Sequence, residues 1–150
     1  MVAHVIDQTS PYYLHASDQS SNLLVSQPLN GDNYPTWCQA FTMAIQAKNK
    51  LGFIDGNLKN PAANSLDFDA WTRCNSMVQS WLVQSAIPTI SNSILWIEDA
   101  YAVWIDLRDH FPNSILWIEG IHKFVYAFEN EHAHIIYFSS SKTNSFVKIF

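Results

Sequence analysis

The spacing of apolar side chains predicts a helix over residues 34–50. Either Asn33 or Asp32 can cap its N-terminus, and Pro35 suits the first turn, where a backbone N–H has no helical partner. The positions that follow at helical intervals are Trp37, Phe41, Ala44, Ile45 and Lys48. The helix is expected to end before Gly52, which opens a turn-rich stretch.

Three more helices are expected further along the chain. Asp67 can cap a second helix that stops before Pro88, and a short third helix is expected over residues 88–95. A fourth starts near residues 98–99, whose two carboxylates suit a helix N-terminus. Its apolar stripe consists of Ala100, Val103, Trp104, Leu107 and Phe111. Residues 33–111 are therefore expected to form a small all-α helical bundle.

The two flanks differ from this pattern. Residues 1–32 are rich in Ser, Asn, Gln and Asp, and we expect an extended arm that docks through the apolar patch 23–25. Residues 112–150 form a tail with β-like composition, in which Asn113–Glu119 repeats Asn92–Glu98 letter for letter. Two copies are too few for a solenoid, so the repeat is interpreted as a duplication, and the tail as a possible gene-model artefact.

Composition narrows the class of protein. Apolar residues make up 48% of the 150, which gives ample material for a core and excludes disorder throughout. The formal net charge of −5 disfavours a strong electrostatic grip on nucleic-acid phosphates. The start of the chain lacks the basic and apolar regions of a signal peptide, and the longest uncharged run, 74–97, is too polar for a bilayer. We therefore expect a cytoplasmic protein.

Several blocks of residues, in the same order, resemble the N-terminal domain of copia-type retrotransposon Gag proteins. The arm segments 11–18 (PYYLHASD) and 24–37 (LVSQPLNGDNYPTW) and the segment 47–56 (AKNKLGFIDG) are similar to that family's opening motifs. The segments that resemble its later helices are Trp71-x-x-Cys74-Asn75, Met77-Val78-x-Ser80-Trp81-Leu82 and Ala102-x-x-Trp104-x-x-Leu107 to Phe111. The resemblance extends over about residues 11–111.

The resemblance implies a non-enzymatic structural role, in which Gag chains associate with one another into a particle around element RNA. The expected partner is a second copy of the chain, bound through the helical domain. Beyond Phe111 the family pattern would continue into more helices and a CCHC zinc knuckle, and neither that knuckle motif nor an Asp-Thr/Ser-Gly protease triplet occurs here. Two alternatives remain open: a truncated relic of an element, and a host-recruited module that binds a peptide or RNA.

Candidate metal ligands occur in three places, and a structural interpretation is favoured at each. Cys38 and Cys74 lack the short spacing of a zinc site and are interpreted as reduced thiols. The helical triplet Asp106, Asp109 and His110 is interpreted as a solvated face. In the tail, His132 and His134 would share one face of a strand, with Glu129 and Glu131 on the other. We expect neither metal nor cofactor.

Catalysis and nucleic-acid binding are disfavoured in the same way. There is no nucleophile elbow, Walker loop or dinucleotide fingerprint, and Asp67 and Asp69 straddle a helix start, where capping carboxylates are expected. The tryptophans Trp37, Trp71, Trp81 and Trp104 could stack on bases, but they lie on apolar helix faces and core packing is favoured. The basic cluster Lys48-Asn49-Lys50, with Lys59 further on, is interpreted as a solubilising edge. We expect no enzyme, small-molecule substrate or membrane partner, and the sequence gives no direct evidence for a nucleic-acid partner.

Overall fold

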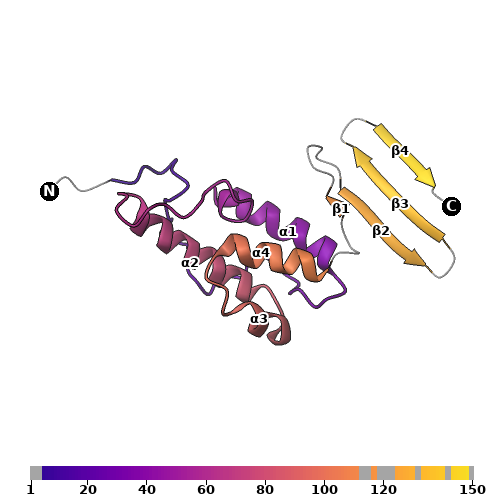
Figure 1. Ribbon diagram of the computed structural model, residues 1–150, viewed down its shortest axis with the longest axis horizontal. Coiled ribbons are helices and arrows are strands. Elements are labelled where there is room, and N and C mark those ends of the chain that lie inside the picture. Colours follow the sequence, from indigo (N-terminus) through magenta and orange to yellow (C-terminus); the bar gives the residue numbers. More distant parts are fainter. Residues whose placement is uncertain (1–4, 112–115, 118–123, 131–132, 141–142, 149–150) are drawn as a thin grey trace. The chain divides into compact units, whose positions relative to one another are not determined.

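The computed structural model describes residues 5–111, 116–117, 124–130, 133–140 and 143–148. Contacts within the chain divide it into two units, Met1–Leu107 and Arg108–Phe150. The helices are α1 (Tyr34–Ala47), the 3₁₀ turn η1 (Leu51–Phe53), α2 (Phe68–Gln84), α3 (Pro88–Ile94) and α4 (Ala100–His110) (Figure 1). The all-α prediction is confirmed for this part of the chain. The boundary at residue 112 and the division of arm from bundle stay predictions.

The first helix is three residues shorter than expected because its end is a Schellman motif. Asn49 adopts a φ of 55°, a left-handed conformation that asparagine tolerates better than most residues. The Lys50 N–H donates to the carbonyl of Ile45 at 3.0 Å, and the Asn49 N–H donates to that of Gln46 at 2.9 Å. The chain therefore turns sharply here and presents three consecutive polar residues, 48–50, at the end of α1.

The helix starts follow the predictions only in part. Asp99 caps α4 as expected, since its Oδ1 accepts the N–H groups of Tyr101 at 2.7 Å and Ala102 at 3.3 Å. Neither Asn33 nor Asp67 makes a side-chain capping bond. The Asn33 amide instead joins the loop before α1, accepting from the Asn30 N–H and donating to the Pro28 carbonyl.

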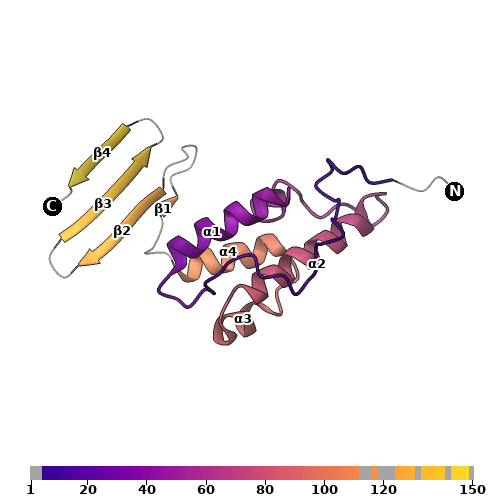
Figure 2. The same cartoon turned by 180° about the vertical axis from the view of Figure 1, so that it is seen from behind.

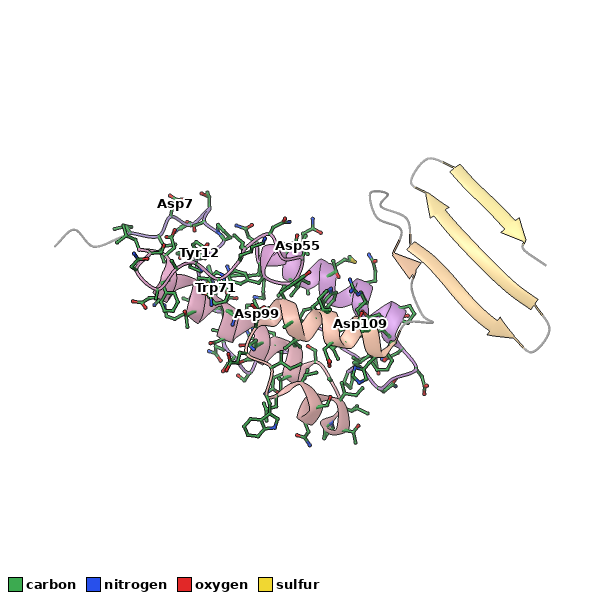
Figure 3. The ribbon with its side chains drawn as sticks, in the orientation of Figure 1. Asp7, Tyr12, Asp55, Trp71, Asp99 and Asp109 are labelled. Atoms are coloured by element: carbon green, nitrogen blue, oxygen red, sulfur yellow. The ribbon has the colours of Figure 1, made fainter. Side chains whose placement is uncertain are left out.

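The core of the helical unit is built from aromatic side chains. Trp37 stacks on Phe41 with ring centroids 5.3 Å apart, and both pack against Trp104, at 5.8 and 5.7 Å. These contacts join α1 to α4, which lie side by side in both views (Figures 1 and 2). A second group links the arm to the bundle: the Tyr12 and Phe53 rings, and the Phe53 and Trp71 rings, are each 6.2 Å apart. Tyr12 and Trp71 are labelled in Figure 3.

The arm packs on its own helices, but its main anchor is not the predicted one. Leu23 is 70% exposed and Leu24 is half-buried, so only Val25 of the expected patch is buried. Leu29 is fully buried and pairs with the chain after α2 in a parallel bridge to Ala86. The prediction missed Leu29, because one leucine between Pro28 and Asn30 does not form a visible apolar run.

Gly56 should not tolerate a side chain. Its φ is +82°, and a Cβ at this position would lie 3.1 Å from the Tyr101 ring. Because the backbone conformation is strained for any L residue and the ring must move, Gly56→Ala is expected to cost about 1–3 kcal/mol. Urea unfolding measures the change, with Ala63→Gly in the exposed loop as the control. A variant as stable as the wild type would contradict this account of the turn.

The second unit is a four-stranded antiparallel sheet. Its strands are β1 (Leu116–Trp117), β2 (Phe124–Asn130), β3 (Ala133–Ser140) and β4 (Thr143–Lys148), in the order β1-β2-β3-β4. The register pairs Tyr126 with Tyr137, and Tyr137 with Phe146. The strand-like composition of the tail therefore corresponds to strands in the structure.

Candidate functional site

Five residues from the bundle hold the arm, and together they are called the arm seat. Lys48, Asn49 and Lys50 come from the Schellman turn that ends α1, while Cys74 and Trp81 come from α2. Figure 2 shows the arm crossing over the helices. The first three residues are consecutive, and the left-handed conformation of Asn49 turns the chain at this point. The two α2 residues lie seven positions apart, which is two helical turns, and so share one face.

The arm seat binds the backbone of the arm more than its side chains. Lys50 Nζ donates to the Tyr13 carbonyl at 2.6 Å, and Trp81 Nε1 donates to the Gln19 carbonyl at 2.8 Å. Two further donors reach the arm in the same way: Asn49 Nδ2 to the Thr9 carbonyl at 3.1 Å and Cys74 Sγ to the Tyr12 carbonyl at 3.2 Å. Four donors from the bundle therefore satisfy four arm carbonyls.

One ion pair adds to these bonds. Lys48 Nζ lies 2.5 Å from Asp18 Oδ1 and also stands over the Trp81 ring, 5.1 Å from its centroid. Burial acts to raise the pKa of Asp18, but the hydrogen bonds from Lys48 and the His15 N–H, with the charges of both lysines, lower it overall. Lys50 is 1% exposed, and this burial lowers the pKa of its ammonium group. The lysines are therefore engaged with the arm, so the prediction of a solubilising edge was wrong for Lys50.

The pKa of Asp18 predicts a difference in acid stability. Because folding lowers this pKa below 3.8, the ionised carboxylate stabilises the folded state above that pH, and the stabilisation is lost as the pH falls through the folded pKa. Asp18→Asn is therefore expected to be less stable than the wild type at pH 7, with the difference narrowing below pH 3.8. Denaturant unfolding between pH 7 and 2 measures it, and the exposed Asp109→Asn is the control. A difference that stays constant with pH would exclude an ionised Asp18–Lys48 pair.

A groove of about 610 Å³ lies beside α2 and the α3–α4 connection. Its walls include Ser20 and Ser21 of the arm, and Glu98 is its one charged lining residue. Trp96, at its edge, is 85% exposed, and Leu95 is 54% exposed. The Gln79 side chain holds the connection by donating to the Ile97 carbonyl at 2.6 Å. The backbone that carries the exposed Trp96 indole is therefore held in place by a hydrogen bond at the next residue.

The four tryptophans proposed as a base-stacking platform are buried. Trp37, Trp71, Trp81 and Trp104 are all at most 8% exposed. Three of their indoles donate to backbone carbonyls inside the helical unit, including Trp37 to Ser85 and Trp71 to Leu58. The favoured interpretation, core packing, is confirmed.

The candidate metal ligands in the described helices are not brought together. Cys38 and Cys74 are buried free thiols on different helices, and burial raises the pKa of both. No group of three His, Cys, Asp or Glu side chains that could hold a metal occurs among the residues with described side chains. On α4, Asp109 pairs with Arg108 at 3.2 Å on the surface.

The candidates that remain are the carboxylate pair at the start of α2 and the possible metal ligands in the tail. Asp69 is exposed in the first turn of α2, next to Asp67 at its start. In the tail, Glu131 and His132 lie outside the described residues, while Glu129 and His134 are Cα partners across β2 and β3. The metal hypothesis for the tail stays untested. Along the described part of the chain, no helix has the length and apolar character needed to cross a bilayer.

Sequence reasoning missed Trp96 and Lys50. In the run Ile94–Ile97 only the two isoleucines keep the three-residue spacing of a buried face, so the spacing already indicated that residues 95 and 96 point elsewhere. No comparable signal existed for Lys50. Its burial depends on the arm, which is 37 residues away at Tyr13.

The described helical unit therefore combines an arm held on a seat with one exposed tryptophan beside a groove. Residues 15–62 match the family model of the Gag-polypeptide of LTR copia-type. The match confirms the resemblance over that segment, which includes the second half of the arm, α1 and η1, and it supports a Gag-like role in a retrotransposon. Gag domains are in general structural and non-catalytic. No curated protein and no solved structure matches the chain.

Proposed function

We propose that the helical unit is a non-enzymatic, Gag-like structural domain that associates with further copies of the chain through the Trp96 groove. The observation that carries this proposal is the exposure of Trp96, at 85%, in a unit whose other described tryptophans are buried. Tryptophan is enriched at the centres of protein interfaces, where its burial supplies much of the binding energy.

The chemistry around Trp96 supports a second copy as the partner. The chain carries a net charge of −5, so two copies carry a net electrostatic repulsion when they approach each other. The groove has Glu98 as its one charged lining residue and otherwise presents serine, glutamine and apolar side chains. Association at this face therefore brings few like charges together. The buried thiols Cys38 and Cys74 suit a reducing compartment, and the cytoplasm is where we propose that the domain acts.

Trp96→Ser is expected to weaken self-association of the full chain by about tenfold or more, since truncating a central tryptophan typically costs at least 1–2 kcal/mol of binding free energy. Light scattering behind a sizing column, over a concentration series, gives the molar mass. Leu66→Ser is the matched control, because Leu66 is 83% exposed but lies before α2, outside the groove lining. Equal loss in both variants, or none in Trp96→Ser, would contradict this interface.

A further inference from the structure

The arm and its seat carry a second inference, which rests on the proposed self-association. We propose that when two copies associate, they exchange arms, so that residues 7–25 of each copy lie on the arm seat of the other. The occupant of the seat is then the same segment of chain, supplied by a second copy.

The way in which the arm is bound makes exchange possible at little cost. Among the described residues, the backbone-to-backbone hydrogen bonds of residues 7–22 stay within the arm, such as Tyr13 to Ser10 and Asn22 to Gln19. The bonds that hold the arm come from side chains of the seat, and they are the same whichever copy supplies the arm. Exchange of identical elements preserves the contacts between arm and seat and is therefore a low-cost route to a dimer.

Part of the contact between the arm and its seat is open to solvent. A pocket of about 390 Å³ lies between the arm and the end of α1, lined on one side by Tyr13, His15 and Asp18 and on the other by Ala47–Asn49. Apart from Tyr13 and Ala47, the residues that line this pocket are polar. Few apolar contacts are therefore lost when this part of the arm leaves the seat.

Exchange requires a hinge between the arm and its fixed end, and the segment 26–28 lies at that place. Leu29 stays attached, since its N–H donates to the Ser85 carbonyl at 2.8 Å and its carbonyl accepts from the Ile87 N–H at 3.0 Å. The three residues before it, 26–28, are all exposed, and the third is a proline. Short connections between a fixed end and a separate segment favour exchange over closure.

The position of the groove connects exchange to association. Ser20 and Ser21 belong to the arm, directly after Gln19, whose carbonyl binds Trp81, and they form part of the wall of the Trp96 groove. A copy that docks at the groove therefore touches the arm that is to be exchanged. Because the two chains are identical, the arm of the docking copy also lies beside the groove of that copy.

The ion pair between Lys48 and Asp18 provides a direct test, because a carbodiimide joins an amine to a carboxylate only where they touch. Equal amounts of unlabelled and ¹⁵N-labelled full chain are mixed in denaturant, refolded, treated with carbodiimide, and separated into monomer and dimer by sizing. Mass spectrometry of the linked 18–48 peptides then shows whether each link joins chains of the same or of different label. Asp18→Asn removes the link and is the control.

Exchange predicts that about half of the 18–48 links in the dimer join a labelled to an unlabelled chain, because partners are drawn at random. Links in the monomer should all carry a single label. If the dimer contains both labels but no mixed links, arm exchange is wrong while self-association stands. If no dimer forms, both proposals fail, and absence of the link from the monomer would show that the arm does not lie on the seat.

Discussion

Replacing Trp81 with alanine is expected to destabilise the helical unit by about 3–5 kcal/mol, enough to unfold a domain of ordinary stability. The Trp81 side chain is 0% exposed, so its removal leaves a large cavity beside α2. The same substitution removes the indole N–H that binds the Gln19 carbonyl and the ring under Lys48. The arm therefore loses one of its attachments, and Lys48, which pairs with Asp18 of the arm, loses its aromatic support. Thermal and urea unfolding, followed by circular dichroism, measure the change.

Two matched variants separate these effects. Trp81→Phe keeps an aromatic ring but loses the indole N–H, and should cost about 1–3 kcal/mol because the hydrogen bond to the Gln19 carbonyl is lost and the smaller ring leaves part of the site unfilled. Trp96→Ala makes the same chemical change as Trp81→Ala at a site 85% exposed, and should alter stability by less than about 0.5 kcal/mol. A melting temperature unaffected by Trp81→Ala would show that the assigned helix face is wrong.

Lys50→Ala is the second large effect, at about 2–4 kcal/mol of lost stability. The lysine stem is buried, so the substitution leaves a void. Its Nζ is also the donor for the Tyr13 carbonyl. Urea unfolding is again the measurement, and Lys59→Ala, on the exposed loop after η1, is the control.

Lys50→Met tests which part of the lysine matters. Methionine fills much of the stem volume without a charge, and the lowered pKa of Lys50 indicates that burying the charge is itself unfavourable. Lys50→Met should therefore recover part of the stability lost in Lys50→Ala. If the alanine variant is as stable as the wild type, the lysine is not part of the arm seat.

The helices could be predicted because their signals are local. The proline that begins α3, the acidic cap of α4 and the regular spacing of Trp37, Phe41 and Ile45 all lie within a few residues of the structure they determine. The core tryptophans followed from the same periodicity. The end of α1 was misplaced by three residues, because a left-handed asparagine such as Asn49 is visible only as a modest preference.

The arm could not be predicted in the same way, because its contacts join distant parts of the chain. Leu29 is one leucine among polar residues, and its burial depends on the backbone at Ser85. The sequence around Lys50 predicts a lysine on the surface, because the arm that buries it is distant in the chain. The seat also binds carbonyl groups, which every residue has, so side-chain identity in the arm carries little information about the contact.

The central claim, that copies associate through the Trp96 groove, is tested most directly by ¹⁹F NMR of the full chain with 5-fluorotryptophan at its six tryptophans. Trp96→Phe identifies the Trp96 resonance by its loss. We predict that this resonance shifts as the protein concentration rises and the molar mass increases, while the resonances of the buried Trp37 and Trp104 stay in place. A Trp96 resonance that does not move while the mass increases, or a mass that stays monomeric at every concentration, would contradict the account.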